Sequence, residues 1–323
     1  AALGYDEREE LADTLERAEQ TLLAVGKRRS TEDYVSLATI TDAYFARLTH
    51  LQTHRGEPTG IATGYHDLDQ ITGGFQRGDL IILGARPSVG KTSLLLCMAE
   101  QMAQSGHRVG IVSLEMKNEA LETRLLALRT GIETQRIMNG QLNEEELGCC
   151  VVALGDIAQL PIWIDQTAGQ RIGEIRAKAR RLHAAGKLDI LMVDYLQLIV
   201  GTGKPENRVQ EVSEISRSLK ALARELDIPL IAASQLSRQV EGRASKVPML
   251  SDLRDSGAIE QDADIVLFLH REEMYDKDTD MRGLAELHIA KHRNCSLDVF
   301  PMRFDAATTR FQNLESYRGA EGY

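Results

Sequence analysis

The sequence lacks an excess of positive charge. Its 323 residues carry a formal net charge of −10 at pH 7, and its pI is about 5.4. A protein that coats itself with a phosphate backbone is usually basic, so any nucleic-acid contact must be local, such as loops that line a channel. With 43% hydrophobic and 27% charged residues, the chain has an ordinary globular composition. Its length suits one large α/β domain with an appendage, or two small domains.

Long apolar runs and metal-binding cysteine patterns are also missing. No run approaches the roughly 20 apolar residues of a membrane-spanning helix, and no signal peptide is visible. The four cysteines, Cys97, Cys149, Cys150 and Cys295, lack metal-ligand spacing, and the adjacent Cys149 and Cys150 are poorly placed to bridge each other. We therefore expect free thiols in a reducing, cytoplasmic compartment. Because the sequence does not begin with methionine, we expect a fragment or a processed chain.

The strongest motif lies between Asp79 and Leu96. The apolar run Leu80–Leu83 is typical of a strand that is covered on both faces, and an apolar helix is expected from Ser93 onward. The intervening residues 85–92, ARPSVGKT, form a P-loop in the required setting, after a strand and before a helix. The alternative is an ordinary glycine-rich turn between a strand and a helix.

The P-loop residues suit phosphate binding. Backbone N–H groups of such a loop surround the β-phosphate, and the helix N-terminus adds partial positive charge. Gly90 leaves room for the backbone to approach phosphate, Lys91 should reach the β- and γ-phosphates, and the Thr92 hydroxyl should bind Mg²⁺. The first motif position is Ala85, with Gly84 one residue earlier, and both are small enough for the turn.

Two helical stretches precede this motif. Residues 3–29 have a narrow apolar stripe that must dock on their own domain or on a neighbouring subunit, and residues 30–54 have a second stripe. His54 to Gly60 is rich in chain breakers, which favours a domain boundary there. The expected segments are a helical linker region at 1–54, the main domain at 55–316, and a glycine-rich disordered tail at 317–323.

Beyond the P-loop, apolar runs alternate with amphipathic stretches. This alternation predicts an α/β fold with a mostly parallel sheet and helices on both faces. The last two strands have no helix between them and should form a hairpin at the edge. The expected strands are Val109–Leu114, Ile190–Asp194, Leu230–Ser234, Ile265–Leu269, Leu284–Lys291 and Val299–Phe304, and the expected helices are Glu119–Thr130, Ile172–Ala185 and Val209–Leu226.

Three polar side chains come at the ends of predicted strands, where ligands bind in open α/β sheets. Asp194 could anchor Mg²⁺, or it could simply begin an exit loop. Glu115 could orient and deprotonate an attacking water, or it could cap the next helix. Gln235 could sense the γ-phosphate, or it could be an ordinary polar strand end.

Several stretches together carry a family resemblance. Besides the P-loop they are SLEM at 113–116, DYLQL at 194–198, SQLSR at 234–238 and SDLRDSGAIEQDAD at 251–264. This set resembles the RecA-like ATPase domain of bacterial replicative DNA helicases, the DnaB family. The resemblance covers about 61–313 and, more weakly, the first helix, which looks like the family's interdomain linker helix. We expect the family's amino-terminal domain, which engages primase, to be absent from this sequence.

The resemblance implies a role for each matched residue of a nucleotide site. Lys91 and Thr92 would hold phosphates and Mg²⁺, with Asp194 as a direct or indirect partner of the Mg²⁺. Glu115 would be the catalytic base, and Gln235 would couple the nucleotide state to DNA. The expected cofactors are ATP and Mg²⁺, and the expected nucleotide contacts are Ser88, Gly90, Lys91, Thr92, Ser93, Arg124, Lys291 and Arg293.

The basic pair Lys291 and Arg293 matches the family's subunit boundary. Arg293 would act as an arginine finger in trans, with Lys291 beside it, and such a finger can be worth roughly 10³–10⁵ in rate. Arg124 would instead reach the nucleotide within its own subunit. Without the resemblance, Lys291 and Arg293 would be interpreted as solvated strand residues. Cys295 stands where relatives commonly have glycine.

Two loops are expected to contact DNA. One is Gly201–Arg208, with Lys204 and Arg208 as cations, although a plain surface loop is the alternative. The other is 254–257, where the resemblance implies that Arg254, Asp255 and Gly257 hold the backbone of a single strand. Neither loop contains an aromatic residue, so base stacking is not supported. Contact through phosphates alone suits a motor that is indifferent to sequence.

The combined expectation is an ATP-driven homohexamer that encircles single-stranded DNA and unwinds duplex at the replication fork. The resemblance implies further partners, namely primase, a helicase loader and a clamp-loader subunit, with no membrane. It also implies a cytoplasmic protein that is nucleoid-associated at replication forks. The alternatives are a recombinase-type ATPase that forms filaments, and a nucleotide-gated DNA-binding scaffold. The pattern at 252–264 favours the helicase over both.

Overall fold

The computed structural model describes residues 35–53, 58–201, 208–253, 257–293 and 295–314. The chain separates into two compact units, Ala1–Gly56 and Glu57–Tyr323. The expected helix at 3–29 and tail at 317–323 lie outside the described residues, so the expected domain limits stay a prediction. Among the described helices, none is both long and apolar enough to cross a membrane. All four cysteines are free thiols, as expected.

The first unit contains helix α2 (Leu37–Thr53), which confirms a helix within 30–54. The stripe expected for this stretch, Leu37, Ile40, Tyr44 and Leu48, is present. Each of these four side chains is at least 45% exposed.

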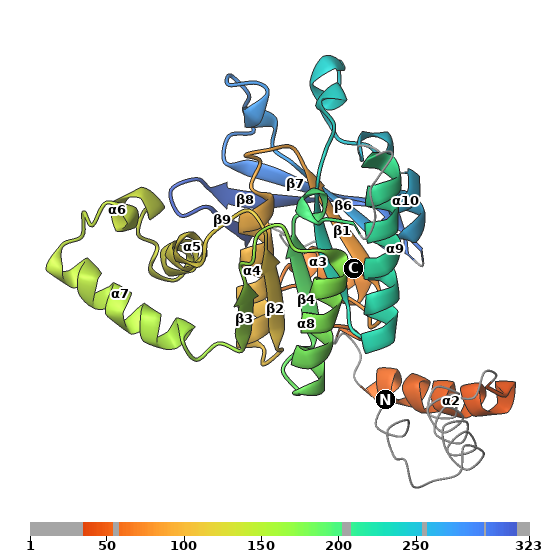
Figure 1. The fold of residues 1–323 in the computed structure, drawn as a ribbon. Helices are drawn as coiled ribbons and strands as arrows, with labels where there is room; N and C mark the ends of the chain where they lie inside the picture. The colour runs from red at the N-terminus through yellow and green to blue at the C-terminus, as the bar shows by residue number, and fades with distance from the viewer. Residues whose placement is uncertain (1–34, 54–57, 202–207, 254–256, 294, 315–323) are drawn as a thin grey trace, which may run out of the picture. The chain divides into compact units, whose positions relative to one another are not determined.

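The second unit is organised around one sheet of nine strands (Figure 1). They are β1 (Leu80–Ala85), β2 (Val109–Ser113), β3 (Ile162–Asp165), β4 (Ile190–Asp194), β5 (Leu230–Gln235), β6 (Ile265–His270), β7 (Leu284–His292), β8 (Val299–Asp305) and β9 (Arg310–Asn313). Their spatial order is β3-β2-β4-β5-β1-β6-β7-β8-β9. Neighbours from β3 to β6 are parallel, whereas β7, β8 and β9 pair antiparallel. The predicted mostly parallel sheet with an antiparallel edge is therefore confirmed.

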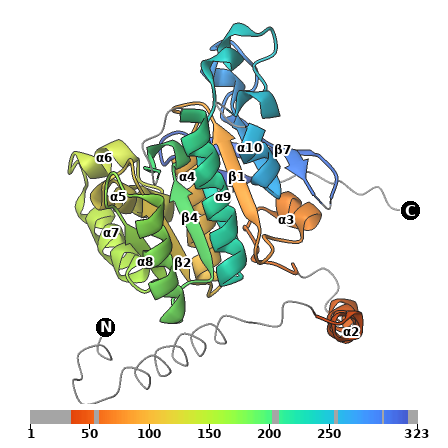
Figure 2. The same ribbon diagram turned by 45° about the vertical axis from the view of Figure 1, so that its right-hand side comes forward.

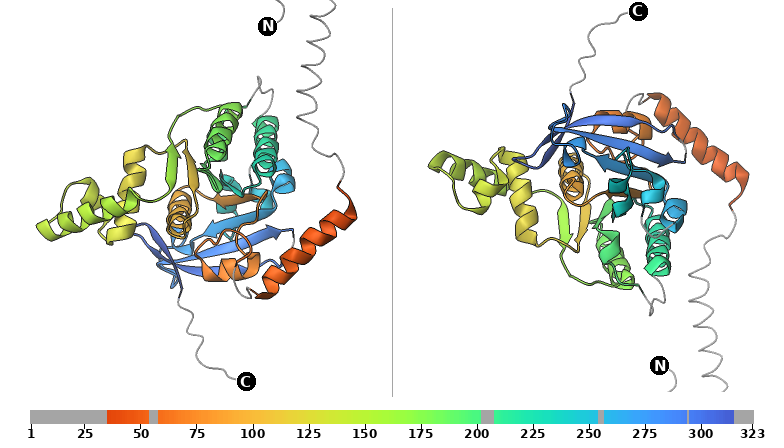
Figure 3. Two further views of the ribbon diagram at one scale, coloured as in Figure 1. Left: turned by 90° about the horizontal axis from the view of Figure 1, so that it is seen from below. Right: turned by 90° about the horizontal axis from the view of Figure 1, so that it is seen from above.

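Helices cover both faces of this sheet (Figure 2, Figure 3). Side chains alternate between the faces along β1, so Ile81 and Leu83 pack with α4 while Leu80 and Ile82 pack with α8 and α9. Burial on both faces explains why β1 is a continuous apolar run. The helices of this unit are α3 (His66–Thr72), α4 (Lys91–Gln104), α5 (Asn118–Thr130), α6 (Thr134–Met138), α7 (Glu144–Ile157), α8 (Ile172–Ala184), α9 (Arg208–Leu226) and α10 (Gly257–Asp262).

The register of the strands creates two functional edges. At the carboxyl edge, Ala85 pairs with Gln235, and Ser113 pairs with Asp194. The predicted polar residues thus meet where the P-loop begins. At the opposite edge, the start of β1 lies beside the start of β6 and the end of β7. The length of β1, six residues, separates the two edges by roughly 20 Å.

Several short elements differ from the sequence-based expectation. Strands β3 and β9 were not predicted, because each has only four residues, too few for a clear alternation. Helices α6 and α7 were not predicted either, and the apolar residues of α7 include the exposed Leu147, Val151 and Val152. Helix α4 begins at Lys91, two residues before the expected start at Ser93, because its N-cap is Gly90 of the P-loop.

Candidate nucleotide site

The P-loop connects β1 to α4 with an unusual backbone. Ser88 has φ 65° and Gly90 has φ 114°, both in the left-handed region. A Cβ on Gly90 would lie 2.8 Å from the ring of Phe311, and one on Gly84 would lie 2.7 Å from Phe268. Glycine at 84 is therefore required by packing against β6, while the following residue can be the buried Ala85.

A cavity of about 730 Å³ opens beside the P-loop. This volume lies within the range of roughly 300–1,000 Å³ that is usual for small-molecule sites. Residues from β1, α4, α5, β5 and the β8–β9 hairpin contribute to its walls. They include the expected Ser88, Gly90, Lys91, Thr92, Ser93, Glu115, Arg124 and Gln235, together with Met116, Tyr195, Phe304 and Thr309, which were not expected.

Lys91, Thr92 and Asp194 form the buried base of the site. Thr92 Oγ1 donates to Asp194 Oδ2 at 2.5 Å, and Lys91 Nζ lies 3.5 Å from Asp194 Oδ1. Asp194 is 3% exposed, and its Oδ1 receives no hydrogen bond from the described residues. A hydroxyl and a carboxylate oxygen are the hard donors that Mg²⁺ prefers, so these residues fit the expected metal.

The Lys91 ammonium is held in a partly dehydrated setting. It lies 4.1 Å from the centre of the Tyr195 ring, a cation–π contact. Burial lowers the pKa of Lys91, and the negative charges of Asp194 and Glu115 oppose this shift. A bound phosphate would therefore stabilise the charged form of Lys91, which burial disfavours.

Glu115 and Arg124 face the same cavity from two neighbouring segments. Strand β2 ends at Ser113, so Glu115 lies beyond the strand rather than at its last position, and it is exposed. Arg124 projects from α5 and donates to Ser93 Oγ at 3.3 Å. Burial lowers the pKa of Arg124, whereas the charges of Asp194 and Glu115 raise it.

Gln235 is the last residue of β5 and is joined to the Asp194 segment by Gln197. The Gln235 backbone N–H donates to Gln197 Oε1 at 3.1 Å, and Gln197 Nε2 donates to Ser234 Oγ at 2.9 Å. From the P-loop, Arg86 Nη1 donates to the carbonyl of Leu236 at 2.7 Å. Direct hydrogen bonds thus connect the P-loop and Gln197 to the residues around Gln235.

Arg271 supports the P-loop from behind and was not expected from the sequence. It is only 7% exposed, and its Nη1 donates to the carbonyl of Val89 at 3.0 Å. Its Nε donates to Glu273 at 2.9 Å, and its guanidinium lies 3.8 Å from the centre of the Phe304 ring. Since 182 residues separate Arg271 from Val89, no local pattern could have indicated this contact.

Comparison with known proteins identifies the family. The DnaB-like helicase C terminal domain matches residues 60–313. The chain belongs to this helicase family. It is 46% identical to the replicative DNA helicase DnaC of Bacillus subtilis (strain 168), over 97% of this chain and 69% of the relative. It is 45% identical to the replicative DNA helicase DnaB of Geobacillus stearothermophilus, with the same two coverages.

Two solved structures agree with this family and fold. One is an ATPase domain with a TM-score of 0.83 and 39% identity, and the match covers 88% of this chain and 100% of that one. The other is a DnaB-like replicative helicase, solved to show its interactions with primase, with a TM-score of 0.81 and 37% identity, covering 94% and 72%. The predicted RecA-like fold, family and helicase function are confirmed: this is a nucleotide-using replicative DNA helicase.

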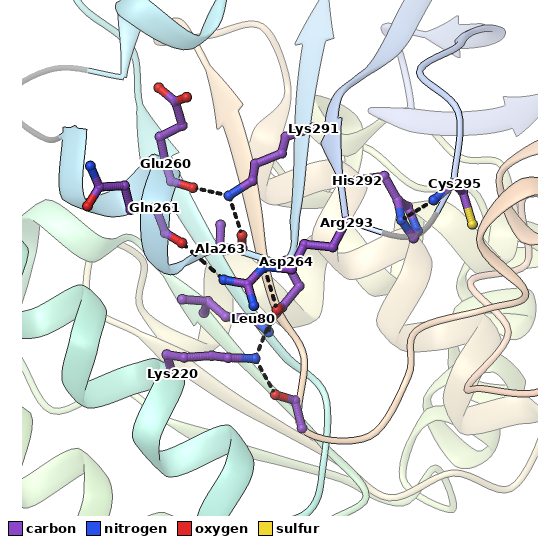
Figure 4. A network of polar contacts seen from close by, with 11 residues as sticks. Leu80, Lys220, Glu260, Gln261, Ala263, Asp264, Lys291, His292, Arg293 and Cys295 are labelled. Atoms are coloured by element: carbon purple, nitrogen blue, oxygen red, sulfur yellow. Dashed lines mark hydrogen bonds and ion pairs between the residues drawn. The ribbon is translucent and has the colours of Figure 1, made fainter. Parts of the chain in front are cut away.

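In this helicase, Lys291 and Arg293 do not lie in the cavity. They lie at the opposite edge of the sheet, about one strand length, roughly 20 Å, from the P-loop. Lys291 Nζ donates to the carbonyls of Glu260 and Ala263, and Arg293 Nη2 donates to that of Gln261 at 3.2 Å (Figure 4). Cys295 donates its N–H to His292 Nδ1 at 3.1 Å.

The expected DNA contacts are only partly described. Lys204, Arg254 and Asp255 lie outside the described residues. Arg208 begins α9, where its guanidinium donates to the Glu211 carboxylate and to the carbonyl of Gln197. Gly257 begins α10 and is exposed, with open space where a Cβ would stand.

Proposed function

We propose that this helicase binds ATP and Mg²⁺ in the cavity beside the P-loop and hydrolyses the ATP to move along single-stranded DNA. The contact between Thr92 and Asp194 carries this proposal, because it places a hydroxyl and a carboxylate oxygen beside the phosphate-binding loop. Mg²⁺ bound there would neutralise charge on the phosphates. Lys91, at 3.5 Å from Asp194, would exchange part of that contact for the β- and γ-phosphates.

The remaining cavity residues would orient and activate water. Glu115 would hold the attacking water and accept its proton, a contribution of typically about 10²–10⁴ in rate. Arg124 would contact the phosphates from the same subunit, held by its bond to Ser93. The backbone N–H groups of Ser88 and Gly90 would bind the β-phosphate. Gln235 would report the nucleotide state through Gln197 and the segment that follows β5.

We assign Arg293, with Lys291 beside it, to the nucleotide site of a neighbouring subunit. The separation of roughly 20 Å between the two sheet edges supports action in trans, because a side chain cannot span it. The six subunits of a homohexamer would then each complete the site of the next. The exposed apolar side chains of α2 support a role for segment 1–54 in tying subunits together.

The DNA contacts would come from Lys204 and Arg208 on one segment, and from Arg254, Asp255 and Gly257 on the other. Contact through phosphates would make translocation independent of sequence. The interactions of the solved DnaB-like helicase with primase support primase as a partner of the whole protein. A helicase loader and a clamp-loader subunit, and a cytoplasmic place at replication forks on the nucleoid, follow from the family resemblance.

Steady-state ATPase activity with and without single-stranded DNA tests this function. We expect strong stimulation of the wild-type protein by DNA and its loss in Arg254→Ala, with the basal rate retained. Stimulation that survives in Arg254→Ala would remove that segment from the DNA path. No stimulation in the wild type, in a sample that sizing shows to be hexameric with ATP, would overturn the motor and favour a nucleotide-gated scaffold.

A further inference from the structure

Asp264 is a buried carboxylate at the edge of the sheet that carries Arg293. It lies between α10 and β6, and its Oδ2 accepts the backbone N–H of Leu80 at 2.8 Å (Figure 4). Its Oδ1 lies 3.3 Å from Arg293 Nε, and its backbone carbonyl accepts the Arg293 N–H at 3.1 Å. Asp264 therefore contacts both the main chain and the side chain of Arg293.

Lys220 holds this carboxylate from the other side. Its Nζ projects from α9 and donates to Asp264 Oδ2 and to the carbonyl of Gly78, the latter at 2.8 Å. The side chains of Lys220 and Asp264 are only 12% and 8% exposed. Both charges are therefore largely removed from water, which makes this contact costly to break. Arg293, whose side chain is 44% exposed, is the outward member of the group.

Helix α10 contributes the other contacts to the basic pair. Its last carbonyls, at the negative end of the helix, accept hydrogen bonds from Lys291 and Arg293. Helix α10, which contacts Arg293, begins at the proposed DNA contact Gly257, and α9, which carries Lys220, begins at the proposed DNA contact Arg208. Two helices thus join this group to Arg208 and Gly257.

We propose that Asp264, fixed by Lys220, is a positioning residue that sets the direction in which Arg293 leaves its own subunit. The inference rests on the proposed action of Arg293 in trans. The Asp264 charge holds the Nε side of the Arg293 guanidinium. The other side of the guanidinium then points toward a phosphate of the neighbouring subunit. Without that charge, Arg293 would sample several directions, and the rate would fall while nucleotide binding stayed intact.

Asp189 provides a matched control. Like Asp264, it directly precedes a parallel strand at the same edge, and its Oδ2 accepts the N–H of Arg108, at 2.8 Å, as well as Arg108 Nε at 2.7 Å. Both aspartates therefore tie neighbouring strand starts together and pair with a cation. Of the two, Asp264 is the one that contacts Arg293. An effect of Asp264→Asn that Asp189→Asn does not share would be due to the lost contact with Arg293 and not to weaker strand pairing.

The first measurement is the ATPase kinetics of Asp264→Asn, Asp189→Asn and Lys220→Met. We expect Asp264→Asn and Lys220→Met to lower kcat by roughly tenfold or more at unchanged KM, less than the roughly 10³-fold or greater loss of the finger itself. Lys220→Arg should restore most of the rate, and Asp189→Asn should match the wild type. A normal kcat in Asp264→Asn, or an equal loss in Asp189→Asn, would overturn the inference. If Asp264→Asn does not fold, Lys220→Met carries the same test.

Mixed rings separate positioning from a general loss of structure. Asp264→Asn mixed with Glu115→Ala should exceed the summed activity of the two separate rings, because Glu115→Ala subunits supply correctly placed fingers. Asp264→Asn mixed with Arg293→Ala should show no gain, because both lack the same function. If Arg293→Ala and Glu115→Ala themselves fail to complement, the proposed trans action fails. If they complement each other but Asp264→Asn does not behave like Arg293→Ala in the same mixtures, only the positioning role fails.

Discussion

Thr92 and Asp194 are 102 residues apart in the sequence, yet the Thr92 hydroxyl donates to the Asp194 carboxylate at 2.5 Å. This contact joins the first turn of α4 to the end of β4, and it leaves Asp194 Oδ1 buried without a hydrogen bond from the described residues. Two oxygen groups with a spare acceptor beside a phosphate-binding loop are suited to a hard cation.

Replacement of Thr92 should therefore weaken the metal more than the fold. We expect Thr92→Ala to raise the Mg²⁺ concentration for half-maximal ATPase by about 10–100-fold. Thr130→Ala is the control, because its hydroxyl also lies on a helix but donates to the carbonyl of Leu126, away from the site. A Mg²⁺ titration of ATPase activity checks this, and identical midpoints for the two variants would contradict the metal site.

Arg271 should stabilise both the P-loop and the whole unit. Arg271→Met would remove the donor to Val89 and the ion-pair partner of Glu273, so we expect a loss of about 3 kcal/mol in the free energy of unfolding. Nucleotide affinity should fall as well, because the loop loses its support. Urea denaturation and titration with a fluorescent nucleotide measure the two effects. Replacement of the exposed Arg282 by methionine should change neither stability nor nucleotide affinity. An Arg271→Met variant with normal affinity would show that Arg271 contributes to stability and not to nucleotide binding.

Stability near the Asp264 edge should depend on pH through Asp79. Burial, and then the charge of Asp264, raise the pKa of Asp79 from 3.8 to about 6. Because the folded protein holds this proton more tightly than the unfolded chain, the stabilising contribution is present below about pH 4 and is lost as pH rises through about 6. We expect Asp79→Asn to remove this loss, so that the variant gains stability over the wild type from about pH 4 to about pH 7. Denaturation midpoints across that range check the sign. A variant whose stability relative to the wild type falls as pH rises would refute it.

The apolar stripe of α2 should matter for assembly rather than for folding of the second unit. We expect Ile40→Ser combined with Tyr44→Ser to shift the protein toward species smaller than hexamers in mass photometry, because both exposed side chains would be buried against a neighbouring subunit. Thr41→Ala combined with Thr49→Ala changes polar positions of the same helix and should leave the distribution unchanged. Hexamers that persist in the serine variant would remove α2 from the subunit contact.

Much of the site could be predicted because its signals are local. The P-loop, the strand that ends at Asp194 and the strand that ends at Gln235 are each contained in a short consecutive stretch. Parallel strands place their carboxyl ends at one edge of the sheet. The residues that follow these strands can therefore be predicted to lie close together. The four-residue strands β3 and β9 were missed because they carry too little pattern to stand out.

The sequence by itself determined the alternation of strands and helices, the phosphate-binding loop and the family. The tertiary structure alone decided that Arg271 supports Val89. It alone also decided that Arg293 pairs with Asp264, itself paired with Lys220, at the edge far from its own P-loop. Local patterns follow from the periodicity of the backbone and from residue size. Contacts between residues that are far apart in the chain depend instead on strand order and register, which the packing of the whole sheet selects.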